Sequence, residues 1–154
     1  MQKELEVAQI FALRLIKFRM RSKYELQSRL KRKHFSQEII EQVLDLLSDL
    51  GYVNDLIFAK AWVNSRLQAK PRSRKLLAYE LKKKGIESSM IERSLAELTL
   101  EKEEQMARQL VGRRVAKLKG LPKETQKRRL SGYLCRRGFS TGVCLKIINE
   151  LEEL

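Results

Sequence analysis

The sequence predicts an all-α fold of three tandem three-helix repeats, each like a helix-turn-helix unit, in an elongated and curved molecule. A helix with Leu77 and Leu81 at helical spacing ends at Gly85, and a second apolar-periodic run follows it. The same order of residue types occurs 51 positions earlier, from Leu26, and 53 positions later, from Leu130. Such self-similarity indicates an array of small units that cannot bury their apolar faces alone. The composition, with 34% charged residues and only two prolines, suits helices joined by short loops.

We expect the first repeat to span residues 1–50. Its first helix covers about residues 3–18, and Ser22 is a suitable N-cap for the second helix because its hydroxyl can accept from an unpaired amide. His34 ends that helix at a position that favours a left-handed conformation, where the other repeats have glycine. Ser36 is expected to cap the third helix, which stops at Gly51. The predicted apolar stripes are Val7, Ala8, Phe11, Ala12, Leu15 and Phe18 in the first helix, Leu26 and Leu30 in the second, and Ile39, Ile40, Val43, Leu44, Leu47 and Leu50 in the third.

The second repeat is expected to span residues 51–99. Asn54 is a suitable N-cap for its first helix, which carries Phe58 and Trp62 one turn apart. We interpret this aromatic pair as core in preference to a platform for nucleobases. The next helix starts near Ser73, and the sixth helix covers about residues 88–98.

The third repeat is expected to span residues 100–154. Its first helix, about residues 101–118, has acidic residues at its start and basic residues at its end, as the helix dipole favours. Gly120 and Pro122 end it, and an eighth helix with Leu130 follows. The ninth helix runs from Ser140 to the C-terminus.

The net charge of +14 indicates an anionic partner, which could be nucleic acid, an anionic membrane or an acidic protein surface. Nucleic acid is the leading candidate. The sequence has no continuous apolar run of signal-peptide or membrane-spanning length, so we expect a cytoplasmic protein without a membrane partner. We also expect a monomer.

The basic clusters carry the functional signal. Arg72, Arg74 and Lys75 lie at the start of a predicted helix, where the dipole disfavours cations, so helix stability does not explain them. Clusters at helix C-termini are explained equally well by helix stability and by contact with phosphates or acidic side chains. The predicted partner- and DNA-binding residues are Lys31, Arg32, Lys33, Arg66, Arg72, Arg74, Lys75, Lys82, Lys83, Lys84, Arg113, Arg114, Lys127, Arg128, Arg129, Arg136 and Arg137.

Nothing in the sequence predicts catalysis. It contains one histidine, no glycine-rich phosphate loop after a strand, and no serine or cysteine beside a base. We therefore expect no catalytic residue, no metal site and no cofactor. Cys135 and Cys144 lack metal-ligand spacing and are interpreted as reduced thiols near or in the core.

An ordered set of motifs resembles the RecX family of bacterial RecA regulators. These motifs are Gly51-Tyr52-Val53-Asn54-Asp55 with Phe58-Ala59 and Arg66, then Leu81 to Ile86, then Arg136-Arg137-Gly138-Phe139-Ser140. The resemblance implies tandem three-helix repeats and a protein that binds RecA filaments on single-stranded DNA, in the filament groove. It also implies inhibition of recombinase, ATPase and strand-exchange activity in DNA repair, recombination and the SOS response. Stimulation of the recombinase, and the way in which inhibition would work, stay open.

We expect phosphate contacts with little sequence preference and strong salt dependence. The alternative is an autonomous helix-turn-helix protein or a non-specific nucleic-acid-binding protein. The predicted recognition helices offer little arginine or asparagine to read base edges, which weakens the helix-turn-helix alternative. The hypothesised basic face that meets DNA phosphates and acidic filament surface consists chiefly of Arg72, Arg74, Lys75, Lys82, Lys127, Arg128 and Arg136.

Overall fold

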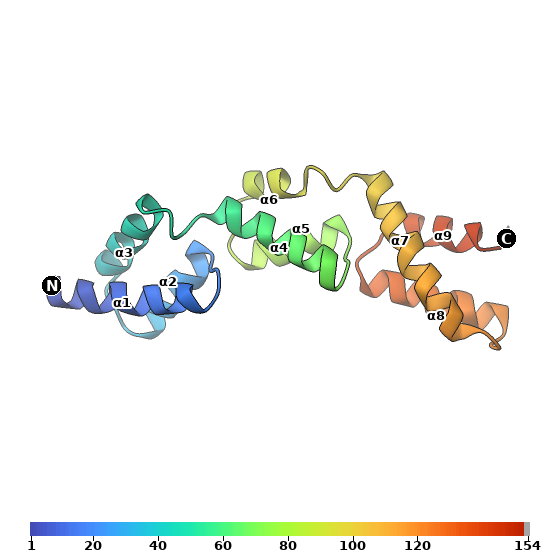
Figure 1. Ribbon diagram of the computed structural model, residues 1–154, viewed down its shortest axis with the longest axis horizontal. Coiled ribbons are helices and arrows are strands. Elements are labelled where there is room, and N and C mark those ends of the chain that lie inside the picture. The colour runs from blue at the N-terminus through green and yellow to red at the C-terminus, as the bar shows by residue number, and fades with distance from the viewer. Residues whose placement is uncertain (153–154) are drawn as a thin grey trace. The chain divides into compact units, whose positions relative to one another are not determined.

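The computed structural model describes residues 1–152, and within that range the chain is all-α, with no strand. Three successive helix triplets confirm the predicted fold class (Figure 1). The helices are α1 (Gln2–Phe18), α2 (Lys23–Arg32), α3 (Gln37–Asp49), α4 (Asp55–Ala69), α5 (Arg74–Lys83), α6 (Ser88–Leu95), α7 (Leu100–Val115), the 3₁₀ helix η1 (Ala116–Leu118), α8 (Lys123–Arg136) and α9 (Thr141–Glu150).

The chain divides into two compact units, which are described separately. The first unit holds Met1–Trp62 and Glu80–Ser94, and the second holds Val63–Tyr79 and the chain from Leu95 onward. The middle triplet is therefore shared, because its helices α4 and α5 each contribute to both units.

Side-chain caps fix the helix starts where the sequence predicts them. Ser22 accepts from the Glu25 amide at 3.2 Å, and the Glu25 carboxylate accepts from the Ser22 amide, which completes a capping box at α2. Ser36 and Ser140 accept from amides in the first turns of α3 and α9. Asn54 accepts from two amides of α4, so the three predicted caps, Ser22, Ser36 and Asn54, are confirmed.

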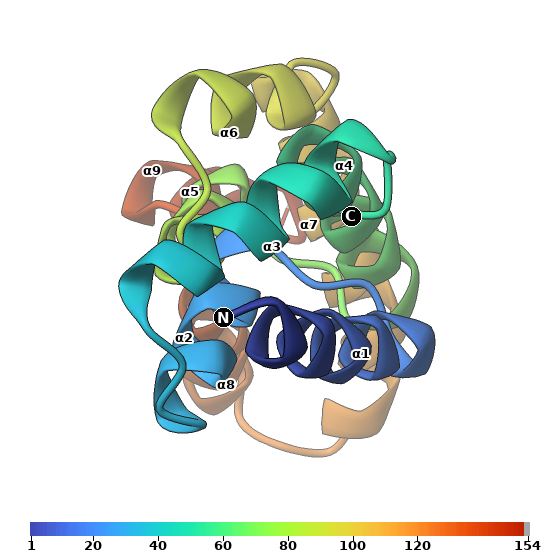
Figure 2. The ribbon, with the colours of Figure 1, turned by 90° about the vertical axis from the view of Figure 1, so that its left-hand side faces the viewer.

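The core of the first triplet lies where α1 and α3 pack together, and the two helices lie side by side in Figures 1 and 2. Ala8 and Ala12 are fully buried there and allow close approach of α3. The prediction that Val7 and Phe18 are core residues is wrong, since they are 52% and 86% exposed. Both lie about a third of a turn from the line of the two alanines. The exposed Leu50 is a further error of the predicted stripe.

Three helix ends differ from the prediction. The sixth helix ends at Leu95 and not at Leu98, although Leu98 stays buried in the turn that follows. The last turn predicted for the seventh helix is the 3₁₀ helix η1. The ninth helix ends at Glu150, and the last two residues of its predicted span, 153 and 154, lie outside the described residues.

Consecutive triplets meet through a repeated contact that we call a joint. In the first joint, inside the first unit, the Ser22 hydroxyl donates to the Lys84 carbonyl at 2.7 Å and Tyr24 packs on Gly85. In each case the start of a triplet's second helix contacts the turn after the second helix of the next triplet. The serines of the two joints, and the turn residues that they contact, occur in the same sequence register, at the 51- and 53-residue offsets of the repeats. The residues that pack on the glycines, Tyr24 and Leu76, differ by one position in that register.

The second joint lies inside the second unit. The Ser73 amide donates to the Arg137 carbonyl at 2.9 Å, and Leu76 packs on Gly138. A Cβ on Gly138 would lie 2.5 Å from the Ser73 hydroxyl oxygen, and one on Gly85 would overlap the Tyr24 side chain. Both glycines also have positive φ, so their turns need glycine for conformation and for space.

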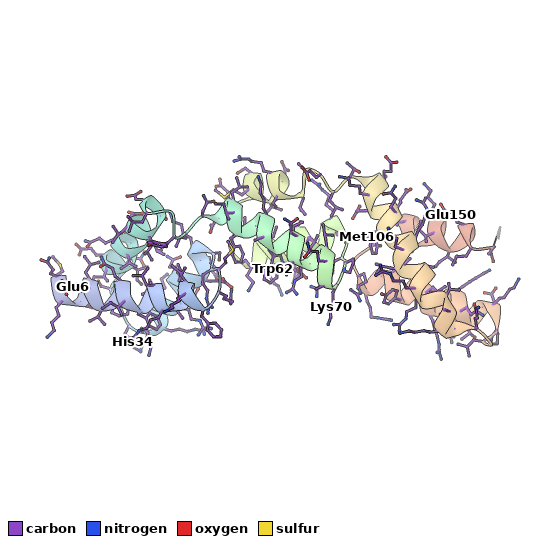
Figure 3. All side chains as sticks on the ribbon, in the orientation of Figure 1. Glu6, His34, Trp62, Lys70, Met106 and Glu150 are labelled. Carbon is purple, nitrogen blue, oxygen red and sulfur yellow. The ribbon has the colours of Figure 1, made fainter. Side chains whose placement is uncertain are left out.

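His34 occupies the equivalent turn between α2 and α3 (Figure 3). Its φ is 65°, which confirms the left-handed conformation predicted for this position. His34 is exposed, so this turn has room for a side chain. At Gly85 and Gly138 a side chain would overlap the facing helix.

Candidate nucleic-acid interface

The second joint gathers arginines from three helices or their ends. Burial lowers the pKa of the Arg72 guanidinium, and the nearby positive charges of Arg66 and Arg137 lower it further. The Arg137 guanidinium donates to the Pro71 carbonyl at 3.2 Å, which holds it beside the segment that precedes α5. Arg137, which is 65 positions after Arg72 and 71 after Arg66, thus shares one electropositive site with them.

Tyr133 on α8 extends this site to Arg114 on α7. The Arg114 guanidinium carbon lies 4.7 Å from the centroid of the Tyr133 ring, and that of Arg137 lies 5.3 Å from it. Both contacts are cation–π interactions, so one aromatic ring holds two guanidinium groups close together. We call Arg66, Arg72, Arg114 and Arg137 the arginine cluster.

All four members of the arginine cluster were predicted from the sequence, but Tyr133 was not. The available signal was an aromatic residue inside an otherwise polar, basic helix three positions before Arg136. That signal is weak without the fold, because it does not say that Arg114 of α7 lies over the ring.

Arg74 has a structural role that the sequence analysis missed. Its guanidinium donates to the carbonyl oxygens of Leu95 and Leu98, and its amide donates to the Glu103 carboxylate at 2.6 Å. These tertiary contacts give Arg74 a structural role that does not depend on the dipole of its own helix, and its contact with a partner stays a prediction. Lys75 beside it is exposed.

In the first unit, Lys84 also takes part in the structure. Its ammonium group lies 2.8 Å from the Glu25 carboxylate and 5.0 Å from the centroid of the Trp62 ring. Burial raises the pKa of Glu25, but hydrogen bonds from Arg19, Lys84 and the Ser22 amide outweigh it and lower that pKa to about 2.

Trp62 on α4, labelled in Figure 3, has the partners of a partly buried structural residue. Its ring stacks on that of Phe58 with a centroid distance of 6.0 Å, and its indole N–H donates to Glu80 at 2.9 Å. These contacts agree with the interpretation of the aromatic pair as core.

The other predicted cations are distributed over several helices of the two units. Lys127 forms ion pairs with Glu124 and Glu152, which offset its charge. Lys33 lies over the Phe11 ring at 5.6 Å from its centroid. The exposed members of the predicted set are Lys31, Arg32, Lys33, Lys75, Lys82, Lys83, Arg113, Arg114, Arg128, Arg129 and Arg136.

No group of three or more histidine, cysteine, aspartate or glutamate side chains that could hold a metal occurs within residues 1–152. In the same range, no helix combines the length and the apolar character that crossing a bilayer requires. Cys135 is exposed, Cys144 is buried, and both are free thiols with their sulfur atoms 3.7 Å apart. Burial and the Cys135 thiol raise the pKa of Cys144 to about 11.

Three protein-family models match the chain in order along its length. They describe the first, second and third three-helix domains of RecX, and they match residues 11–47, 54–95 and 101–148. The chain belongs to the RecX family. The resemblance seen in the sequence motifs is thereby confirmed.

Relatives named Regulatory protein RecX are similar to the chain over most of its length. The protein from Streptomyces coelicolor is 37% identical over 150 residues, which cover 97% of this chain and 80% of the relative. The protein from Thermobifida fusca is 38% identical over 143 residues, which cover 93% of this chain and 77% of the relative.

Two crystal structures share the fold. RecX from Lactobacillus salivarius aligns with a TM-score of 0.86 and 20% identity over the full length of both chains. A second structure, described as regulatory protein RecX, aligns with a TM-score of 0.80 and 21% identity over 95% of this chain and 72% of the other. At these identities the likeness concerns the fold alone.

Proposed function

We propose that this RecX-family protein binds RecA filaments on single-stranded DNA, in the filament groove, and inhibits the recombinase, ATPase and strand-exchange activities of RecA. It acts as a monomeric, non-enzymatic regulator of DNA repair, recombination and the SOS response in the cytoplasm. Membership of a family whose relatives are named regulatory proteins supports this proposal. The observation that carries the contact with DNA is the arginine cluster at the second joint.

The chemistry of the cluster suits a phosphate backbone. Guanidinium groups present several N–H donors in a planar fork, which matches the oxygens of a phosphate group. Because phosphates occur at every nucleotide, such contacts provide affinity and register without a choice of sequence. A regulator that must act on filaments of any sequence needs this kind of contact.

The rate of single-stranded-DNA-dependent ATP hydrolysis by RecA tests the proposal. With the protein present below the molar concentration of RecA, we expect the rate to fall, because one inhibitor bound to a polymer affects more than one subunit. An unchanged rate at an equimolar ratio would contradict inhibition, and an increased rate would identify a stimulator.

A binding measurement separates this function from its rival. If the net charge of +14 alone made the chain a general nucleic-acid-binding protein, random duplex DNA without RecA would be bound equally well at physiological salt. We expect the filament to be preferred, as measured by the anisotropy of a fluorescent label on the protein.

A charge-reversed variant tests the role of the second joint. Arg72→Glu combined with Lys75→Glu should weaken filament binding by about a hundredfold, since two phosphate-directed cations become anions. Arg74 is left unchanged because it holds two backbone carbonyls. The matched control is Lys60→Glu with Lys102→Glu, which reverses two exposed lysines outside the predicted set. Equal binding by the two double variants would exclude the second joint as the contact.

A further inference from the structure

An open apolar groove lies beside the α2–α3 turn of the first triplet. Its volume is about 360 Å³. The Phe11 and Phe35 rings, 6.5 Å apart between centroids, form part of its surface, and Val7 and Ile10 of α1 are each 52% exposed. The lining residues are Val7, Ile10, Phe11, Arg14, Lys33 and Phe35.

The exposure of Val7 and Ile10 has no explanation in the fold of the first unit. Aliphatic side chains that stay half in water contribute little to stability, and a cluster of them favours association with another surface. Among the described residues that line the groove, two are ionisable, and both are cations: Arg14 and Lys33. The groove therefore combines an apolar surface with positive charge.

The equivalent turns of the other two triplets show what covers such a surface. At Gly85 and Gly138 the start of another triplet's second helix packs directly on the turn. In the first triplet, His34 places a side chain at the position where the joints need glycine. A joint of the same kind therefore cannot form on this turn.

The third triplet lacks the serine cap that starts the second helix in both joints. The second helix of the third triplet, α8, begins after Pro122 without a side-chain cap, whereas α2 and α5 are capped by Ser22 and Ser73. A second copy of this chain therefore cannot extend the array by a joint between its α8 and the α2–α3 turn. The surface is left for a different occupant.

We propose that the groove is the docking site for an acidic segment of a protein partner, whose apolar side chains contact Val7 and Ile10 and whose carboxylates pair with Arg14 and Lys33. A protein segment fits better than a nucleobase, because the half-exposed Val7 and Ile10 are aliphatic and offer no face for stacking. The Phe11 and Phe35 rings are partly buried, and Lys33 lies over the Phe11 ring. The proposal rests on the proposed function, in which the partner is the RecA filament. In this proposal the first triplet contacts the RecA protein of the filament, and the second joint contacts the DNA.

The test compares groove variants in two binding measurements. Val7→Gln with Ile10→Gln removes the apolar contacts at positions that are already exposed, and Arg14→Glu reverses a groove charge. The matched controls are Leu145→Gln, at an apolar residue of α9 that is 55% exposed, and Lys3→Glu on α1 outside the groove. Binding is measured by anisotropy to RecA filaments on single-stranded DNA, held with a slowly hydrolysed ATP analogue, and to the same DNA alone.

We expect both groove variants to lose about tenfold or more in affinity for the filament, to keep their affinity for free DNA within about twofold, and the controls to bind as wild type. If the wild type binds filaments and the groove variants bind them equally well, the docking proposal fails while the proposed function stands. An equal loss on free DNA would make the groove a DNA contact and overturn the proposal. Failure of the wild type to bind filaments would overturn the proposed function and this proposal together.

Self-association is the remaining outcome. Sedimentation velocity of the wild type and of the Val7→Gln, Ile10→Gln variant should show the same monomeric species. A wild-type dimer that this variant dissociates would show that a second copy occupies the groove, and would overturn the proposal.

Discussion

The two joints of the molecule place equivalent serines on equivalent turn carbonyls but carry different charges: the Ser22 hydroxyl donates to the Lys84 carbonyl, and the Ser73 amide donates to the Arg137 carbonyl. Each brings the start of a serine-capped helix to a left-handed glycine turn, with equivalent serines at 22 and 73 and equivalent turn residues at 84 and 137. In the first joint, Glu25 accepts hydrogen bonds from Arg19 and Lys84. The residue of the second joint that corresponds to Glu25, 51 positions later, is Leu76, which carries no charge.

A second difference adds to the first. Leu15 in the first unit corresponds in register to Arg66 in the second, while Arg21 and Arg72 correspond to each other and both have a pKa lowered by burial. At Arg21 the nearby charges of Arg19 and Arg29 add to that shift while the carboxylate of Glu25 opposes it, whereas at Arg72 the nearby charges of Arg66 and Arg137 add to it. The comparison teaches that one kind of contact between a helix start and a glycine turn can accompany different electrostatics. The first joint contains an ion-pair network, and the second contains a concentration of positive charge.

Adding a methyl group to either joint glycine should have the largest effect. Gly85→Ala and Gly138→Ala should each destabilise the protein by about 3 kcal/mol, because left-handed strain adds to steric overlap with the facing helix. Gly51→Ala is the control, since its φ is also positive but nothing lies within 4 Å of the added carbon, and it should cost about 1 kcal/mol. Urea unfolding measures these values. Equal costs at the three positions would show that the joints are not closely packed.

Loss of the carboxylate from the first joint should have the next largest effect. Glu25→Gln should lower stability at pH 7 by about 2 kcal/mol, after allowance for solvent screening of a partly buried group. Because the folded pKa of about 2 is below the ordinary 4.5, the stabilisation is complete above about pH 4.5 and is lost as the pH falls through 2. Thermal unfolding from pH 2 to 7 should therefore show a smaller acid destabilisation in the variant. Parallel pH profiles would contradict the ion-pair network.

The charge difference between the joints can be removed by one substitution. Leu76→Glu places in the second joint the carboxylate that the first joint has, and should weaken binding to filaments and to single-stranded DNA by about tenfold. Leu76→Gln is the matched control, because it has the same size and loses the same packing on Gly138 without adding charge. If the two variants bind equally, the arginine cluster does not contact phosphate.

The smallest effect concerns a pair of thiols next to the second joint. Cys135 corresponds in register to Lys82 of the first joint and lies three residues before Gly138. At pH 8 iodoacetamide should alkylate Cys135 at least about tenfold faster than Cys144, because burial and a pKa of about 11 keep Cys144 protonated. The rate at Cys144 should rise as the pH approaches 11. Mass spectrometry of digested samples measures both rates, and similar rates at pH 8 would contradict the buried position of Cys144.

Local features of the sequence were sufficient to predict the helices and several of their caps. The serines at 22, 36 and 140 cap helices because a hydroxyl next to the first free amides acts within one turn. The left-handed His34 and the two turn glycines follow from the same short-range rules. The errors at Val7 and Phe18 arose where two helical faces were both apolar and only packing against α3 decided between them.

The sequence alone determined the class of the molecule, its threefold repetition, its positive charge and, through its motifs, its family, because each of these is written in residue type and spacing. The tertiary structure decided which cations hydrogen-bond to backbone carbonyls and which lie close to one another. Arg74 and Arg137 both belong to basic clusters of the sequence, and only contacts with residues 21 to 66 positions away show that Arg74 donates to the carbonyls of Leu95 and Leu98 while Arg137, held by the Pro71 carbonyl, joins the arginine cluster. Electrostatic energy depends on distance in space, and chain spacing beyond a few helical turns does not report that distance.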